Sequence, residues 1–226
     1  MRRQELARVI DYALVKPINT LKEIERACIE VLNYNIGVLC VLPPFVEFTA
    51  EKLAGSDSKV CAVVSFPFGS SPTEVKVREA QQVIAAGAEE VDFVMNIPLF
   101  KSGDYDLVKQ DIENVTMASK KAGEKLGKEI VVKVIIETGY LSSSEIALAS
   151  RLAEEGGADF VKTCTGFGPR GATLEDVKII LSSVRRAKVK AAGGISNYAK
   201  ALEFVKCGAS RIGTSNAPHI LNEAPP

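Results

Sequence analysis

The sequence predicts a (β/α)8 barrel, and three features of the chain support this fold. Short apolar runs alternate with amphipathic stretches along almost all of the 226 residues, and there are eight such runs. Three amphipathic stretches end in a Gly-Ala pair that leads within a few residues into the next run. No stretch rich in Pro, Gly and Ser divides the chain, so we expect one domain over residues 1–226. A doubly wound open sheet would show the same alternation, and the number of runs favours the barrel.

Most of the eight runs are continuously apolar, which is typical of parallel strands that are covered on both faces. In chain order, strands are expected at Ala13–Val15, Gly37–Leu42, Val60–Phe66, Glu90–Met95, Ile130–Ile136, Asp159–Thr163, Val189–Ala191 and Ser210–Gly213.

The helices between these strands have recognisable start and stop signals. Thr20 with Glu23, and Ser142 with Glu145, form capping boxes. The Gly-Ala pairs at positions 87, 157 and 208 supply left-handed helix ends. Helices are therefore expected at Met1–Asp11 (an extra helix before the first strand), Leu21–Tyr34, Glu74–Ala86, Asp104–Lys125, Glu145–Glu155, Leu174–Val184 and Tyr198–Lys206.

The charge and composition of the chain exclude several classes of protein. Lys plus Arg is 28 and Asp plus Glu is 28, so no basic excess is available to bind nucleic acid. No apolar run reaches about 18 residues, and the N-terminus lacks the apolar region of a signal peptide, so we expect a cytoplasmic protein with no membrane partner. The five cysteines include no CxxC pair, and His219 is the one histidine. We therefore expect reduced thiols and neither a metal site nor another cofactor.

Four charged residues lie inside the predicted strands and are the strongest functional signal. Asp92 lies in the fourth strand, and Lys133, Lys162 and Lys190 lie in the fifth, sixth and seventh. Lys and Asp are rarely buried unless they are paired. A single lysine could extend its amine to solvent from a strand end. Three lysines and an aspartate on four consecutive strands favour a shared site inside the barrel.

A buried lysine cluster of this kind predicts Schiff-base chemistry. A free lysine amine has a pKa of about 10.4 and is protonated at neutral pH. Burial and a second ammonium group both lower the pKa of such an amine, which then can attack a carbonyl carbon. Two lysines and one carboxylate can therefore supply a nucleophile, an electrostatic partner and a proton carrier.

Three glycine-containing segments follow the last three strands, at residues 166–171, 192–195 and 213–216. Loops at this place in a barrel often bind phosphate through backbone N–H groups. For any one loop alone a tight turn is the better interpretation, but the occurrence of all three side by side favours a phosphate site. Residues 166–171 also match G-x-G-x-x-G, but the next strand ends in alanine rather than an acidic residue. The match therefore does not favour nicotinamide binding.

Several of these segments together resemble deoxyribose-phosphate aldolase over nearly the whole chain, from Ile10 to about Leu221. The segments that carry the resemblance are Ser65–Gly69, Val91–Asn96, Val132–Tyr140, Phe160–Phe167, Val189–Ile195 and Ser210–Ser215. The family consists of metal-independent class I aldolases on a (β/α)8 barrel. They cleave 2-deoxy-D-ribose 5-phosphate reversibly to acetaldehyde and D-glyceraldehyde 3-phosphate. The resemblance therefore implies a small phosphorylated sugar and aldehydes as partners.

The resemblance also assigns roles to residues at matching positions. Lys162 would form the Schiff base, Lys190 would keep its amine neutral, and Asp92 would move protons. Substrate contacts are assigned to Asp11, Lys133 and Thr165, and phosphate contacts to Gly171, Gly193, Gly194, Gly213, Ser215 and Asn216. Barrels of this kind commonly associate, so we expect a homo-oligomer.

The chain departs from the family at three places. Ala13 replaces a threonine that faces substrate, Leu42 replaces an asparagine, and the chain ends in Pro226 without the tyrosine that some members use for proton transfer. These departures affect the expected rate and substrate range more than the reaction type. Two alternatives remain at this stage. One is a different barrel enzyme with the same phosphate site, such as another class I aldolase or a sugar-phosphate isomerase with Glu137 as its base. The other is a binding barrel that has lost turnover.

Overall fold

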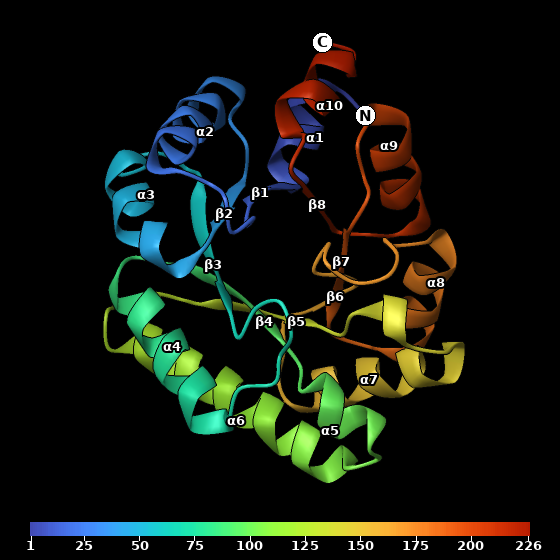
Figure 1. The fold of residues 1–226 in the computed structure, drawn as a ribbon. Coiled ribbons are helices and arrows are strands. Elements are labelled where there is room, and N and C mark those ends of the chain that lie inside the picture. The colour runs from blue at the N-terminus through green and yellow to red at the C-terminus, as the bar shows by residue number, and fades with distance from the viewer.

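The computed structural model describes residues 1–226, and its eight parallel strands close into a barrel in sequence order (Figure 1). β1 pairs with both β2 and β8, which completes the circle. The predicted (β/α)8 barrel is therefore confirmed and the open sheet is excluded. The strands are β1 (Ile10–Leu14), β2 (Val38–Val41), β3 (Lys59–Val64), β4 (Glu90–Val94), β5 (Val131–Ile135), β6 (Phe160–Lys162), β7 (Lys188–Ala192) and β8 (Arg211–Thr214).

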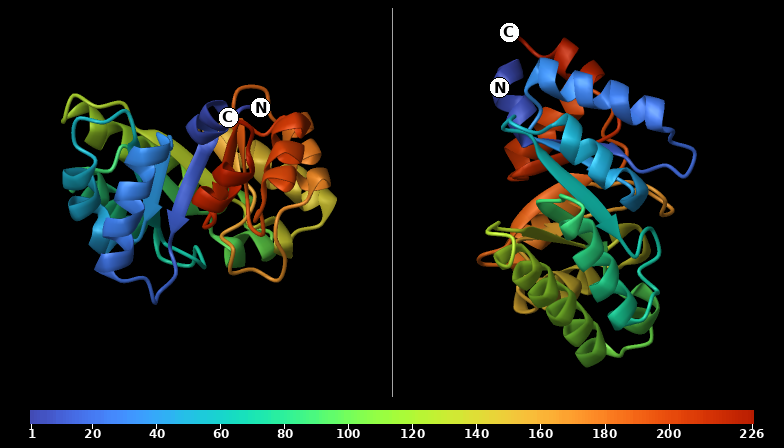
Figure 2. Two further views of the ribbon diagram at one scale, coloured as in Figure 1. Left: turned by 90° about the horizontal axis from the view of Figure 1, so that it is seen from above. Right: turned by 90° about the vertical axis from the view of Figure 1, so that its left-hand side faces the viewer.

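Helices surround the barrel as an outer layer (Figures 1 and 2). They are α1 (Arg3–Val9), α2 (Leu21–Tyr34), α3 (Val46–Lys52), α4 (Thr73–Ala85), α5 (Ile97–Lys101), α6 (Tyr105–Glu124), α7 (Ser143–Glu155), α8 (Leu174–Ser183), α9 (Tyr198–Cys207) and α10 (Ala217–Glu223), with 3-10 turns at Pro43–Phe45 and Thr138–Tyr140. The two chain ends lie together, and the Arg3 N–H donates to the Pro225 carbonyl at 2.7 Å. None of the helices combines the length and the apolar character needed to cross a membrane.

All eight predicted strands and all seven predicted helices are present, with small differences at their ends. The first strand begins at Ile10 rather than Ala13, because Asp11 faces the barrel interior and interrupts the apolar run that the prediction relied on. The extra N-terminal helix is the short α1. Three helices of five to seven residues, α3, α5 and α10, were not predicted, since so short a segment shows no clear helical periodicity.

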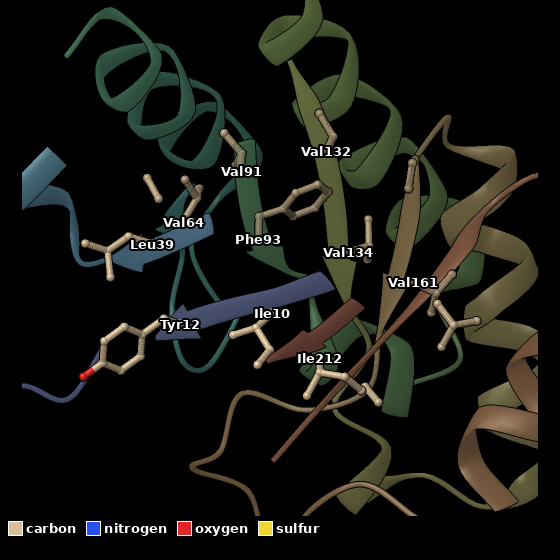
Figure 3. Packing of buried hydrophobic residues seen from close by; sticks show 14 of the residues in the cluster. Ile10, Tyr12, Leu39, Val64, Val91, Phe93, Val132, Val134, Val161 and Ile212 are labelled. Atoms are coloured by element: carbon tan, nitrogen blue, oxygen red, sulfur yellow. The ribbon is translucent and has the colours of Figure 1, made fainter. Parts of the chain in front are cut away.

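The two faces of each strand have different neighbours. Outward side chains such as Leu39, Phe93 and Val134 belong to a cluster of 53 buried residues that joins the strands to the helices (Figure 3). The alternate positions point into the barrel. There, a separate apolar cluster of Val38, Cys40, Cys61 and Val63 fills the side formed by β2 and β3.

The opposite side of the barrel interior is charged. Strand register pairs Asp92 with Lys133 and Lys162 with Lys190, so these side chains project inward from neighbouring strands. Branched apolar side chains usually fill this position in such barrels. Here charged side chains take the place of those apolar ones, which indicates that a functional site lies between β4 and β8.

Candidate active site

Asp92 is the centre of the buried charged cluster. Its Oδ2 accepts hydrogen bonds from Lys162 Nζ at 2.8 Å and from Lys190 Nζ at 2.7 Å. Its Oδ1 accepts from Lys133 Nζ at 2.8 Å and from the Cys61 thiol at 3.1 Å. The side chain of Lys162 is 6% exposed, whereas those of Asp92 and Lys133 are fully buried. The side chain of Lys190 is 1% exposed, so Lys162 is the most accessible lysine of the cluster.

A second layer of ion pairs lies beneath Asp92, toward the amino ends of the strands. Asp11 pairs with Lys190 through Oδ2 and with Arg211 through Oδ1, the latter at 2.8 Å. Glu90 pairs with Lys133 at 2.5 Å and with Arg211 at 3.1 Å. The charged groups thus form one connected network through the barrel.

The network lowers the pKa of Asp92 and raises the pKa values of Lys133 and Lys190. Burial raises the pKa of Asp92, but the charges of Lys133, Lys162 and Lys190 outweigh burial and hold this pKa well below its usual range. Burial lowers the pKa of Lys190, but Asp11 and Asp92 outweigh burial and raise this pKa above its ordinary value. The pKa of Lys133 is raised for the same reason, chiefly by Asp92 acting against burial.

A cavity of about 370 Å³ opens above Lys162 at the carboxyl ends of the strands. Thr165 and Phe167 line it on the β6 side, and Ala13 and Ile18 line it on the β1 side. The carboxyl end is where barrel enzymes carry their active sites. The cavity therefore combines a reachable amine with apolar walls.

Backbone amides of two loops border the same cavity. Gly193, Gly194, Gly213, Ser215 and Asn216 all line it, as five of the six predicted phosphate contacts. The N–H groups of residues 193–196 and of residue 215 have no acceptor within the chain. Free N–H groups at adjoining loops suit an anion such as a phosphate.

Gly171, the sixth predicted phosphate contact, does not line the cavity. A Cβ atom at this position would lie 2.5 Å from the Gly193 carbonyl oxygen, so the close approach of two loops explains why glycine is present. The Ala172 N–H donates to the same carbonyl at 3.1 Å. Gly171 therefore supports the Gly193 loop from outside the cavity.

Replacing Gly171 with alanine is expected to weaken phosphate binding through this contact. The added methyl group would displace the Gly193 loop, at a cost of roughly 1–3 kcal/mol that is typical of overpacking. We expect the KM for a phosphorylated substrate to rise about tenfold, with a much smaller change for the same sugar without phosphate. Steady-state kinetics on the two sugars measures this, and an equal effect on both would contradict it.

Two predicted substrate contacts lie too deep to touch a ligand. Asp11 and Lys133 are fully buried and do not line the cavity, because each is held by opposite charges in the interior. Thr165 does line the cavity, and its hydroxyl donates to Glu137. Of the three predicted contacts, Thr165 alone is in position to meet a substrate.

Glu137, the base expected for an isomerase, is turned away from the cavity. Its side chain is buried and its Oε2 accepts from the Thr165 N–H at 2.9 Å. Gly168 packs against the other oxygen, since a Cβ there would lie 2.7 Å from Glu137 Oε1. Glu137 shapes the loop after β6, and this arrangement favours the lysine chemistry over an isomerase.

No motif in the sequence indicates a cysteine cluster, but the fold brings Cys40 and Cys61 together beside Asp92. The two sulfur atoms and one carboxylate oxygen lie within 4.8 Å of one another. Both oxygens of Asp92 already accept hydrogen bonds from lysine ammonium groups, Oδ1 from Lys133 and Oδ2 from Lys190. A metal cation at this point would meet like charges, so the donor set does not suit one.

Sequence reasoning missed Glu90 and Arg211. Each is the first residue of its strand, where a charged side chain ordinarily faces solvent. The spacing Glu90-Val-Asp92 contains the signal, because residues two apart in a strand point to the same side. Arg211 begins β8 in the same way, two residues before the inward Gly213.

Two departures from the family pattern, Ala13 and Leu42, place apolar side chains at or next to the β1 side of the site. Ala13 lines the cavity directly. Leu42 packs beside Ala13 and Phe66 against the interior cluster that contains Cys40 and Cys61. At these two positions the side chains offer no hydrogen bond to a substrate hydroxyl.

Known proteins that are similar to this chain are aldolases. The model of the DeoC/LacD family aldolases matches residues 4–215. A deoxyribose-phosphate aldolase from Caldanaerobacter subterraneus subsp. tengcongensis is 46% identical over 219 residues, covering 96% of this chain and 93% of its own length. One from Thermococcus kodakarensis is 45% identical over 228 residues, covering 100% of this chain and 99% of its own.

Two solved structures that are similar to this chain are also aldolases. A protein described as "QR15, an Aldolase" superposes with a TM-score of 0.90 and 40% identity, covering 97% of this chain and 95% of its own. The deoxyribose phosphate aldolase of Aeropyrum pernix superposes with a TM-score of 0.89 and 31% identity, covering 97% and 91%. The Aeropyrum pernix protein is described as having a unique tetrameric structure.

Proposed function

The chain belongs to the DeoC/LacD family of aldolases, and we propose that it cleaves 2-deoxy-D-ribose 5-phosphate reversibly through an imine on Lys162. The observation that carries this proposal is the position of Lys162. Its amine is reachable from the cavity, while the other lysines of the cluster are enclosed by carboxylates.

Lys162 starts the reaction as a nucleophile. Its Nζ attacks the aldehyde carbon of the ring-opened sugar, a C–N bond forms, and water leaves to give a protonated imine. Lys190 lies on the neighbouring strand and shares Asp92 Oδ2 with Lys162. Only the unprotonated form of a lysine amine attacks a carbonyl carbon, and the positive charge of Lys190 lies directly beside the reacting amine.

Bond cleavage follows from the electron demand of the imine. When the hydroxyl on C3 loses its proton, the C2–C3 bond breaks and its electrons move into the imine. D-Glyceraldehyde 3-phosphate leaves, and a two-carbon enamine stays on Lys162. Protonation of the enamine and hydrolysis then release acetaldehyde. Asp92 accepts a hydrogen bond from Lys162 and is the carboxylate in place to exchange protons through a water molecule.

The phosphate end of the substrate fits the glycine loops. The unpaired N–H groups of residues 193–196 and 215 would donate to its oxygens. Gly213 leaves room for the Lys190 side chain, since a Cβ at this position would lie 3.1 Å from Lys190 Cε. Anchoring at the phosphate end fixes the distance from phosphate to aldehyde, which selects a five-carbon sugar phosphate.

We further propose that the enzyme is cytoplasmic and acts as a homo-oligomer. The tetramer described for the Aeropyrum pernix relative supports association. Sedimentation velocity on the purified chain tests the association, and a single species at the mass of one chain would contradict it.

The activity is tested by following both products from 2-deoxy-D-ribose 5-phosphate with separate coupled assays for acetaldehyde and D-glyceraldehyde 3-phosphate. Sodium borohydride added with acetaldehyde should reduce the imine and leave a two-carbon adduct on Lys162. Formation of the products in equal amounts, with the adduct on that lysine, supports the proposal. A sugar isomer as product, or no adduct, would overturn it.

A further inference from the structure

Arg211 closes the floor of the barrel at the end opposite to the cavity. It begins β8, which lies between β7 and β1 in the closed barrel (Figure 1). Its guanidinium donates to Asp11 Oδ1 at 2.8 Å and to Glu90 Oε1 at 3.1 Å, and it lies 5.8 Å from the centre of the Phe160 ring. The side chain is 19% exposed and borders a separate cavity of about 680 Å³ with Arg8 and Lys59. Nothing in the reaction described above uses this residue.

Counted over its carboxylates, lysines and arginine alone, the buried network has one more base than acids. Its acids come from β1 and β4, and its bases from β5, β6, β7 and β8, with the Cys40 and Cys61 thiols of β2 and β3 beside them. If all of these acids and bases were ionised, three negative charges would face four positive ones: Asp11, Glu90 and Asp92 against Lys133, Lys162, Lys190 and Arg211. An uncompensated charge is costly in a buried site, so one base is expected to give up its proton.

The contacts indicate which base this is. Arginine does not lose its proton in proteins. Lys133 contacts three carboxylates and Lys190 contacts two. Lys162 contacts Asp92 alone. The least compensated amine is therefore the one that reaches the cavity.

We propose that Arg211 is a positioning residue that keeps Lys162 unprotonated by occupying the carboxylates of Asp11 and Glu90 from the far end of the barrel. The proposal rests on the assignment of Lys162 as the Schiff-base lysine. With Arg211 in place, Lys133, Lys190 and Arg211 together balance the three acids, and Lys162 is the surplus base. Without Arg211, the three acids would be balanced by three lysines, and Lys162 would hold its proton.

Opposite charge changes should therefore move the pH dependence in opposite directions. Arg211→Met removes a positive charge, so Lys162 is harder to deprotonate and the rising limb of kcat/KM moves to higher pH. Glu90→Gln removes a negative charge, so the same limb moves to lower pH. We expect each shift to be on the order of one pH unit. The double variant should return the limb close to its wild-type position.

The experiment measures kcat/KM from pH 5 to 10 on the full chain. Arg211→Lys keeps the positive charge, so the rising limb of its kcat/KM should stay at the wild-type pH. A purely structural role that requires the guanidinium would not predict this rescue by lysine. Arg3→Met is the matched control, because Arg3 also ties chain segments together, through the Leu221 and Ala224 carbonyls, but lies outside the network. Its limb should not move.

The outcomes separate this proposal from the proposed function. The role of Arg211 would be overturned if the rising limb of kcat/KM shifts in the same pH direction in Arg211→Met and Glu90→Gln, or does not shift in either. If Arg211→Met does not fold, the direction of the Glu90→Gln shift decides alone, and an unmoved or higher limb overturns the proposal. Borohydride trapping at pH 9 should still label Lys162 in each folded variant. Absence of that label from the wild type would overturn the proposed function instead.

Discussion

Replacing Lys162 with alanine is expected to abolish aldol cleavage. The variant loses the only amine of the cluster that is both reachable from the cavity and in contact with a single carboxylate. Lys190 also borders the cavity, but Asp11 and Asp92 enclose its ammonium group and raise its pKa against the effect of burial. It therefore cannot replace the missing nucleophile. We expect kcat to fall by about 10⁴-fold or more, as is usual when a covalent nucleophile is removed.

The fall in kcat is checked together with the covalent label. Wild type and variant are incubated with acetaldehyde and sodium borohydride, and the modified peptide is identified by mass spectrometry. Lys188→Ala is the matched control, because Lys188 lies at the amino end of a barrel strand, away from the cavity, with its Nζ 5.9 Å from the centre of the Phe160 ring. A variant without Lys162 that still turns over, or is still labelled in the cavity, would contradict the mechanism.

Sequence reasoning located the strands well, because β-branched runs bounded by helix caps give a strong local signal. α2 has the predicted bounds, Leu21–Tyr34, and its Thr20–Glu23 capping box is present. The short helix α10 was not predicted. A helix of seven residues is stabilised mainly by packing, and so short a segment shows little helical periodicity of its apolar residues. Its position beside α1 depends on the two ends of the chain meeting, which no local pattern records.

The upper part of the site was predictable and the lower part was not. Asp92, Lys162 and Lys190 stand out because a charge inside an apolar strand needs a partner. Glu90 and Arg211 stand at strand beginnings, where charges are ordinary, and closure of the barrel alone brings them together. Burial of a lysine was also an incomplete guide. Lys76 is fully buried in α4, where it pairs with Asp111 at 2.6 Å, and it lies outside the cavity.

Asp92→Asn is the second substitution for which we expect a large effect. Each carboxylate oxygen of Asp92 accepts two hydrogen bonds, from Lys133 and Cys61 at Oδ1 and from Lys162 and Lys190 at Oδ2. An asparagine side chain replaces one of these acceptors with an NH₂ group, which would face ammonium donors. Loss of the charge also leaves two acids opposite four bases. We expect a loss of roughly 3–5 kcal/mol in the free energy of unfolding, and a fall in kcat of about 10²–10⁴-fold from impaired proton transfer.

The pH dependence of stability distinguishes the lost charge from a mere change of shape. The pKa of Asp92 is held well below its usual range, so its ionised form stabilises the folded wild type above about pH 4, the pKa of an aspartate in the unfolded chain. That contribution disappears as the pH falls toward the lower pKa of the folded state. Asparagine never contributes it. Urea denaturation should therefore show the largest difference between wild type and Asp92→Asn at pH 6 to 7, and a smaller one below about pH 4.

A matched control removes the same charge without removing a buried partner. Asp57 is exposed, and its carboxylate makes no hydrogen bond or ion pair, so Asp57→Asn should change the free energy of unfolding by less than about 0.5 kcal/mol. A difference between wild type and Asp92→Asn that stays constant with pH would assign the effect to packing rather than charge. Wild-type kcat in a destabilised Asp92→Asn would separate folding from catalysis and would remove Asp92 from the proton path. Joint loss of kcat and of the pH-dependent stability is expected, because one carboxylate both holds the three lysines together and accepts from the amine that carries the substrate.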